Sequence, residues 1–127
     1  MIHLRQGQAA FRKSLMRAYG GQCAVTATST KEVLEAAHIL PYRGTQTHRV
    51  DNGLLLRADI YTLFDRRLLA IVPQTGSRFI TRVAPHIDDE RYVALDREPL
   101  RIVPTHRRHQ PSSYYLAQHS ATCTWLT

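Results

Sequence analysis

Two short apolar runs, separated by a polar loop and followed by a helical pattern, constrain the fold of this chain more than any other feature. The first run, residues 35–40, ends at a proline, which restricts the preceding residue to extended backbone, so we predict a strand that carries His38. Residues 54–56 predict a second strand. Residues 60–66 predict a short helix with Asp59 as its N-cap. The predicted order is strand, loop, strand, helix.

The segment between the two strands has the composition of a surface loop. Residues 42–53 are polar, contain two glycines and show no hydrophobic period. The dipeptide Asn52-Gly53 at its end predicts a turn, because both residue types are favoured in turns. Loops of this length in small domains often carry functional residues, and we expect the same here.

Helices and a hairpin are expected on both sides of this unit. Apolar residues recur at helical spacing in residues 6–19. Residues 68–72 and 78–83 predict a β-hairpin beside the first strands, and residues 111–119 predict a short helix that packs onto the domain. A chain of 127 residues is long enough for one compact domain. We therefore expect a single domain of the α+β class over residues 1–127.

Composition limits the class of protein. The hydrophobic fraction of 43% and the charged fraction of 21% are those of a soluble globular protein, and no segment approaches the roughly 20 apolar residues that span a bilayer. The N-terminus lacks the apolar core of a signal peptide, so we expect a cytoplasmic protein without a membrane partner. Cys23 and Cys123 belong to no CxxC pair, which argues against a structural zinc site.

The charge is strongly basic and unevenly distributed. The net charge is +7, the pI is near 10.0, and most of the basic side chains are arginines. Residues 1–82 carry 12 basic and 5 acidic side chains, whereas residues 83–127 carry 5 of each. A basic surface concentrates polyanions, so nucleic acid is the expected partner. A protein that is merely soluble, or one that binds an acidic protein, also fits this charge.

Four polar residues in the predicted unit have residue types and spacing that suit hydrolysis of phosphodiesters. Thirteen residues separate His38 from Asn52, eight separate Asn52 from Tyr61, and three separate Tyr61 from Asp65. Positions 61 and 65 therefore share one face of the predicted helix. A metal-assisted phosphodiesterase needs a base that activates water, a residue that orients the base, and a ligand for a hard cation.

The sequence around these residues resembles one subfamily of HNH endonucleases. The resemblance rests on Cys23-Ala-Val-Thr, Glu35-Ala-Ala-His38-Ile-Leu-Pro41, Asn52-Gly-Leu-Leu-Leu and Ile60-Tyr-Thr-Leu-Phe-Asp65. It covers roughly residues 4–75, with a core motif at about residues 23–72. A weaker similarity lies at residues 100–104 and 108–112, with Leu116 and His119, in the extension over residues 73–127. The resemblance implies a single HNH nuclease domain with a small ββα-metal (His-Me finger) core, flanking helices and a β-hairpin.

The resemblance also implies the role of each residue. His38 would be the general base that activates water, and Asn52 would hold the loop or the backbone of His38. Asp65 lies at the position of the last metal ligand, and a carboxylate suits one divalent ion, Mg²⁺ or Mn²⁺. Without the resemblance, His38 would be interpreted as a structural histidine, Asn52 as a turn residue and Asp65 as an aspartate near a helix end.

Two departures from the family pattern weaken the expected metal site. Many HNH enzymes carry aspartate or histidine where this chain has Ala37, and the subfamily usually has histidine where this chain has Tyr61. A phenol with a pKa of about 10 is a poor ligand for hard cations. Glu35 is either a replacement ligand or an ordinary surface residue. The chain is thus either a metal-dependent DNA endonuclease with a weakened site or a catalytically impaired nucleic-acid-binding or regulatory domain.

Arginines on both sides of the motif are expected to contact the phosphates of duplex DNA. They are Arg43, Arg49, Arg57, Arg66 and Arg67. Each also fits a solvated surface side chain. Analogy with small HNH domains further implies a homodimer or a partner protein that supplies specificity, and a third function remains open, namely an interaction domain for an acidic protein.

Overall fold

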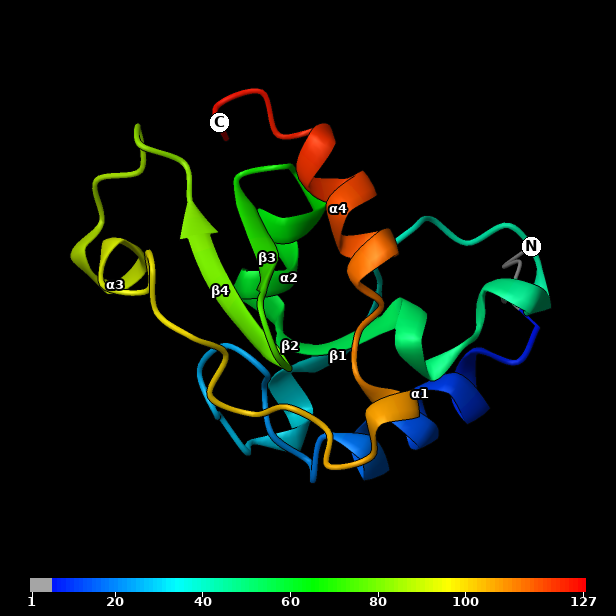
Figure 1. The fold of residues 1–127 in the computed structure, drawn as a ribbon. Coiled ribbons are helices and arrows are strands. Elements are labelled where there is room, and N and C mark those ends of the chain that lie inside the picture. Colours follow the sequence, from blue (N-terminus) through cyan, green and yellow to red (C-terminus); the bar gives the residue numbers. More distant parts are fainter. Residues whose placement is uncertain (1–5) are drawn as a thin grey trace, which may run out of the picture.

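A computed structural model describes residues 6–127, which form a mixed α and β fold (Figure 1). Its helices and strands are α1 (Gln8–Ala18), β1 (Leu34–His38), β2 (Gly53–Arg57), α2 (Ala58–Asp65), β3 (Leu69–Gln74), β4 (Arg78–Val83), α3 (Glu90–Val93) and α4 (Ser113–Ala121). Short 3-10 helices lie between them: η1 (Lys31–Val33), η2 (Thr45–Thr47), η3 (Val50–Asn52) and η4 (Arg107–His109). Among the described residues, no helix is long and apolar enough to cross a membrane.

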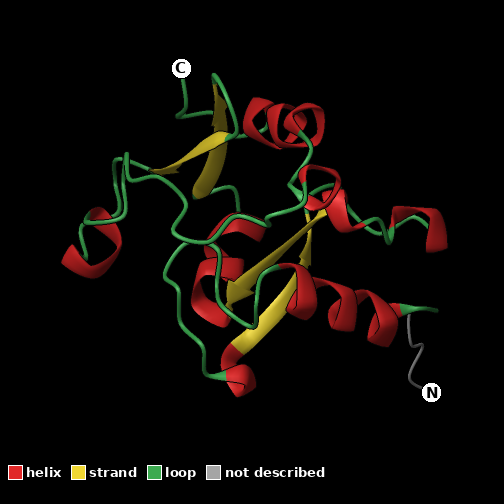
Figure 2. Cartoon of the chain, turned by 60° about the horizontal axis from the view of Figure 1, so that its bottom comes forward, coloured by secondary structure: helices red, strands yellow, loops and turns green. Residues whose placement is uncertain are grey.

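The first two strands and the second helix form the expected ββα unit. β1 and β2 pair in antiparallel register, with Leu34 opposite Arg57 and His38 opposite Gly53. α2 follows β2 without a connecting loop, and Figure 2 shows the two strands beside this helix. The α+β class and the ββα core with flanking helices and a hairpin are confirmed.

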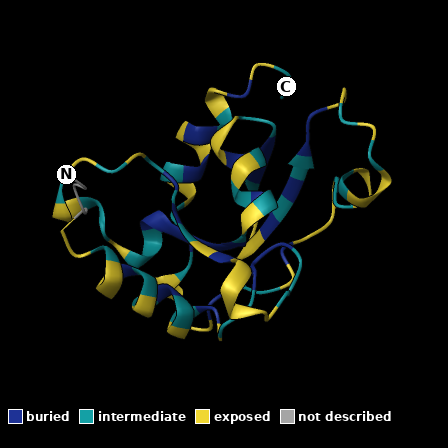
Figure 3. Ribbon diagram, turned by 180° about the vertical axis from the view of Figure 1, so that it is seen from behind, coloured by how far each residue is buried: buried dark blue, intermediate teal, exposed yellow. Residues whose placement is uncertain are grey.

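The core is centred on β2, which is covered by α1 and α2. Leu54, Leu55 and Leu56 are fully buried, so this strand shows no alternation between a buried and an exposed face. Phe11 and Leu15 are the buried face of α1, whereas its outer face is exposed (Figure 3). Each such side chain contributes about 1.5–3 kcal/mol when it is removed from water. This packing fixes the end of β1, where His38 lies.

Gly53 begins a strand instead of forming the predicted turn. Its φ of −133° and ψ of 150° are extended, and Asn52 ends η3 immediately before it. A Cβ atom at this position would lie 2.8 Å from both Leu15 Cδ atoms and 2.9 Å from Phe11 Cζ. Glycine is therefore required by the close approach of α1 and not by the backbone conformation.

Asp59 lies inside the first turn of α2, because the N-cap position is occupied by Arg57. The Asp59 carboxylate accepts hydrogen bonds from Arg57 at 2.6 and 2.9 Å and from the Tyr92 hydroxyl at 2.7 Å. These bonds, chiefly those from Arg57, lower the pKa of Asp59 to about 2. The predicted N-cap is wrong, since this carboxylate instead connects α2 with α3.

The predicted hairpin forms, but it does not extend the first sheet. β3 and β4 pair antiparallel as a separate two-stranded sheet, with Leu69 opposite Val83 and Gln74 opposite Arg78. α4 packs across β3, whose first three residues are buried. The second sheet and α4 therefore form a layer beside the ββα unit, as Figure 1 shows.

Candidate active site

A small cavity of about 90 Å³ lies where the end of β1 meets α2 and α4. It is lined by His38, Ile39, Pro41, Tyr42, Tyr61, Phe64, Asp65, Arg67 and His119. The structure thus brings together four of the predicted site residues, namely the histidine, the tyrosine, the aspartate and one arginine. Asn52, Arg43, Arg49, Arg57 and Arg66 lie outside this lining.

His38 is held by a ring stack and by a second histidine. Its ring lies 4.4 Å from that of Phe11 at an interplanar angle of 7°. His38 Nε2 lies 3.0 Å from Nδ1 of His48, which belongs to the polar loop. The other ring nitrogen of His48, Nε2, lies 2.7 Å from the carbonyl oxygen of Gln6. The three residues form a chain of hydrogen bonds that ends on the backbone.

This chain of hydrogen bonds determines which nitrogen of His38 is basic. The Gln6 carbonyl can only accept, so Nε2 of His48 donates to it. In neutral His48, Nδ1 is then the acceptor, and Nε2 of His38 must carry the proton that is shared between the rings. When both rings are neutral, Nδ1 of His38 is consequently the nitrogen that carries no proton. His48 was not predicted, because nothing in residues 42–53 marks it as a partner of His38.

Asn52 is buried and binds the backbone that follows His38. Its Oδ1 accepts from the Leu40 N–H at 2.9 Å, and its Nδ2 donates to the carbonyl oxygens of Leu40 at 3.2 Å and Thr47 at 3.1 Å. Its own carbonyl accepts from Ile39 N–H at 2.9 Å. Asn52 therefore fastens both ends of the loop to the end of β1, although it does not touch the cavity.

Asp65 and Tyr61 reach the cavity from neighbouring turns of α2. Asp65 is exposed, while Tyr61 is half-buried and packs against the core. Glu35 does not join them. Its side chain is exposed, and it lines a different hollow together with residues at the start of α1, including Arg12. Glu35 is thus a surface residue, and the replacement ligand considered for position 37 does not reach this site.

His119 on α4 is a further cavity residue that the sequence did not single out. Its ring stacks on Phe64 with centroids 3.7 Å apart, and its Nε2 donates to the Phe64 carbonyl at 2.9 Å. Burial lowers the pKa of His119, so the ring is held neutral. Its buried Nδ1 has no hydrogen-bond partner within residues 6–127. A neutral imidazole with an unused lone pair thus forms one wall of the cavity.

A family model described as HNH endonuclease matches residues 23–72. The resemblance to HNH endonucleases is confirmed. The matched residues, here called the HNH segment, include β1, the polar loop, β2, α2 and the beginning of β3. This match suggests nuclease activity and nucleic-acid binding in general. No curated protein sequence matches the chain.

The arginines within the HNH segment do not form one cluster. Arg67 lines the cavity, and its guanidinium donates to the Asp65 carbonyl at 2.6 Å and to Thr122 Oγ1 at 3.2 Å. Arg57 is paired with Asp59, as described above, and Arg49 is paired with Asp51 at 2.9 and 3.1 Å. The side chains of Arg43 and Arg66 are exposed. Of the five, only Arg67 lies beside His38 and Asp65.

The HNH segment offers an incomplete set of metal ligands. Within residues 6–127, no group of three or more His, Cys, Asp or Glu side chains is arranged to hold a metal ion. Asp65 is the only carboxylate among the lining residues, and His119, whose buried Nδ1 has no hydrogen-bond partner within residues 6–127, lines the same cavity. Mg²⁺ commonly keeps several waters and takes one or two carboxylates together with substrate phosphates. The residues fit an ion bound in this manner.

Proposed function

We propose that this chain is a metal-dependent endonuclease that hydrolyses the phosphodiester bonds of DNA. The observation that supports the proposal most strongly is the placement of His38 and Asp65 on one cavity by the two ends of the ββα unit. The base comes from β1 and the carboxylate from α2, within a segment that matches the HNH endonuclease family. Base and metal-ligand types thus occur together at a single hollow.

In the proposed reaction, Nδ1 of His38 removes a proton from water while the water oxygen attacks the scissile phosphorus. The bond from phosphorus to the leaving oxygen breaks, and that oxygen takes up a proton from solvent. His48 keeps the shared proton on Nε2 of His38, so that Nδ1 remains the base. Asn52 acts as a positioning residue, because it fixes the backbone directly after His38.

One Mg²⁺ or Mn²⁺ ion is the proposed cofactor. When bound, it would stabilise negative charge on the phosphate and the leaving oxygen. Asp65 would bind the ion, either Tyr61 or a water molecule beside it would be a second ligand, and solvent would fill the remaining coordination positions. Arg67 adds a positive charge beside the carboxylate and suits the phosphate of the substrate.

Duplex DNA is the proposed substrate. The net charge of +7 and the preference for arginine over lysine favour a phosphate-rich partner. A homodimer, or a separate protein that supplies specificity, stays a prediction from the family resemblance.

The direct test is nicking of supercoiled plasmid by the purified protein. We expect nicked product with Mn²⁺ or Mg²⁺ and none after chelation with EDTA. Plasmid is mixed with the protein at low salt, and product is followed on agarose gels. Cleavage that continues undiminished in EDTA would contradict the metal requirement. If neither Mg²⁺ nor Mn²⁺ supports cleavage, the proposed nuclease activity is contradicted.

Replacing Tyr61 by histidine tests whether position 61 is a ligand. The substitution supplies the imidazole that the family usually has there, on the same helix face as Asp65. We expect Mn²⁺ affinity, measured by calorimetry, to rise by roughly tenfold, which corresponds to about 1.4 kcal/mol. The nicking rate at limiting metal should rise with it.

Tyr61→Phe is the matched control, since it keeps the half-buried ring and removes only the hydroxyl. Equal Mn²⁺ affinity in all three proteins would show that position 61 does not contribute to metal binding.

The second candidate function is a nucleic-acid-binding or regulatory domain with little cleavage. It is favoured by Ala37 and Tyr61 at two ligand positions and by the lack of a three-ligand cluster within the described residues. In that case the protein would shift DNA in a salt-sensitive manner without nicking it at any metal concentration, and Tyr61→His would not restore activity.

A further inference from the structure

Two further hollows on the described surface lie apart from the cavity of His38. One, of about 680 Å³, is lined by Arg49, Val50, Asp51, Gly76, Ser77, Phe79, Arg107, Arg108, His109, Gln110, Pro111, Ser112 and Ser113. A second, of about 290 Å³, shares Val50 and His109 with it and adds Arg17 of α1. Because they share lining residues, the two hollows adjoin, and they are here called the basic groove.

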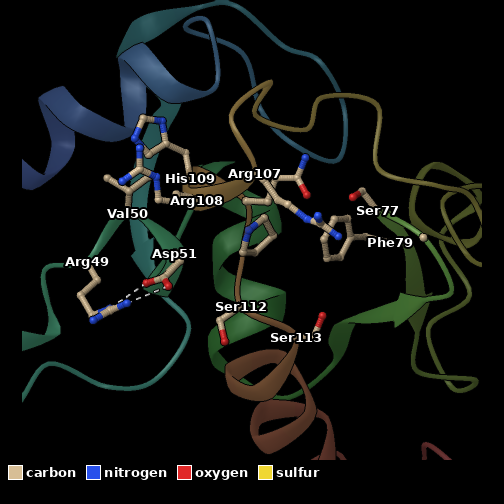
Figure 4. Close-up of a pocket in the computed structure, with 13 residues that line it drawn as sticks. Arg49, Val50, Asp51, Ser77, Phe79, Arg107, Arg108, His109, Ser112 and Ser113 are labelled. Atoms are coloured by element: carbon tan, nitrogen blue, oxygen red, sulfur yellow. Dashed lines mark hydrogen bonds and ion pairs between the residues drawn. The ribbon is translucent and has the colours of Figure 1, made fainter.

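The charge of the basic groove is positive and available for a ligand. Four arginines line it, against the single carboxylate of Asp51, which is already paired with Arg49. Within residues 6–127, no carboxylate pairs with Arg107 or Arg108. Figure 4 shows Arg107 extending toward Phe79 and Ser77, on the opposite side of the groove from Arg49 and Asp51. Cations therefore face the groove from separate segments of the chain.

Arg107 and Arg108 lie in a turn between Pro104 and Pro111, here called the basic turn, whose backbone is held by hydrogen bonds. Gln110 closes the turn by donating from its side chain to the Pro104 carbonyl at 3.0 Å. The backbone N–H of Ser112 donates to the Asp51 carbonyl at 2.8 Å, which joins the turn to η3. Pro104 and Pro111 are buried at its two ends. The arginines thus extend from an anchored backbone, which reduces the entropy lost on binding.

Charge segregation in the fold explains why the sequence did not indicate this groove. Residues 83–127 have balanced charges along the chain. In space, Asp88, Asp89 and Glu90 lie at α3, which stands at the far side of the molecule from η4 (Figure 1). Arg91 is neutralised there by Asp89 at 2.8 Å. Folding therefore separates Arg107 and Arg108 at η4 from this acidic patch.

We propose that the basic groove binds the sugar-phosphate backbone of the same nucleic acid, outside the bond that is cut. The inference rests on the proposed function and adds a second contact region to it. Guanidinium groups would pair with phosphates, and the serine hydroxyls would donate to further phosphate oxygens. The apolar surface of Val50, Phe79 and Pro111 would face sugars.

α4 places the groove close enough to the cavity for one duplex to cover both. Ser113 at its start lines the groove, and His119 near its end lines the cavity of His38. The helix rises by roughly 9 Å between these residues at about 1.5 Å each. Nucleotides of one strand are spaced by about 3.4 Å along the duplex. The helical rise between Ser113 and His119 therefore corresponds to the length of only a few nucleotides.

The test compares two double variants that each remove two positive charges. Arg107→Gln with Arg108→Gln alters the groove, and Arg97→Gln with Arg101→Gln alters exposed arginines outside both hollows. Both are made in the full chain with His38→Ala, and binding to a short fluorescent duplex is measured by anisotropy without metal at several salt concentrations. We expect the groove variant to lose affinity by at least about tenfold and its log–log salt slope to fall by about 1.8, near 0.9 per phosphate contact.

Equal weakening of the two double variants, or unchanged binding of the groove variant, would overturn the proposal. Polyglutamate serves as the probe for an acidic protein, and displacement of the duplex from the groove by polyglutamate at equal charge concentration would also overturn it. The proposed cleavage is judged separately. If the parent nicks DNA and the groove variant binds the duplex normally, only the proposed role of the groove is refuted. If binding depends on the groove but the parent does not nick DNA, only the proposed nuclease activity is refuted.

Discussion

Replacing His38 by alanine is expected to lower the single-turnover rate of plasmid nicking by about 10²- to 10⁴-fold, the usual contribution of a general base. The ring lies on the proposed metal cavity, and its basic nitrogen is determined by the bond to His48. Binding of duplex DNA should change far less, since the loss concerns proton removal and not a phosphate contact. Nicking at the parent rate by His38→Ala would refute the catalytic assignment.

Variants of His48 separate a positioning effect from general damage to the site. His48→Phe keeps a ring beside Phe11 and removes the Nδ1 acceptor, so we expect a slower rate with little change in the KM for DNA. His48→Asn retains an oxygen near the place of Nδ1 and should recover part of the rate. Equal rates in the phenylalanine variant and the parent would show that the histidine pair does not control the base.

Replacing Asn52 by alanine is expected to lower the free energy of unfolding by on the order of 3 kcal/mol, since each buried polar group that is left unsatisfied costs about 1–3 kcal/mol. The side chain satisfies the N–H and carbonyl of Leu40 and the carbonyl of Thr47. Such a loss is a large part of the roughly 5–15 kcal/mol that stabilises a typical domain. Nicking should also fall below the parent rate at temperatures where the variant stays folded.

Urea unfolding followed by tryptophan fluorescence measures this loss. The chain has a single tryptophan, Trp125, whose indole N–H donates to the Arg67 carbonyl at 2.7 Å and reports on the packed state. Asn52→Asp is the control for shape: its carboxylate can accept from Leu40 N–H but cannot donate to the two carbonyls, so it should also be destabilised. A fully stable alanine variant that still nicks DNA would contradict the positioning role of Asn52.

Local patterns were sufficient to predict most elements of the fold. The strand that ends at His38 follows from the proline three residues later, and the hairpin follows from two apolar runs around a turn. Gly53 was misassigned because its requirement is tertiary: the residues that exclude a side chain there belong to α1. The N-cap was predicted two residues too late, since α2 begins at Ala58 with Arg57 as its cap and Asp59 is paired with that arginine.

The candidate site was only partly predictable. His38, Tyr61 and Asp65 share a cavity because their spacing belongs to one ββα unit, which a local pattern can indicate. His119 reaches the same cavity from α4, and no sequence period connects it with residue 38. Arg49 was predicted to contact phosphate and lines the basic groove, whereas Arg107 and Arg108 were missed because averaging charge over residues 83–127 cancels side chains that the fold separates.

The hydrogen bond from His48 to Gln6 makes the protein sensitive to how it is engineered at its N-terminal side. The acceptor is a backbone carbonyl that directly precedes Gly7 and α1. A fusion or deletion that displaces this peptide group would release His48, allow either tautomer of His38, and lower activity while leaving every catalytic side chain intact. Recombinant versions altered there are therefore expected to nick plasmid more slowly than the unaltered chain in the proposed reaction.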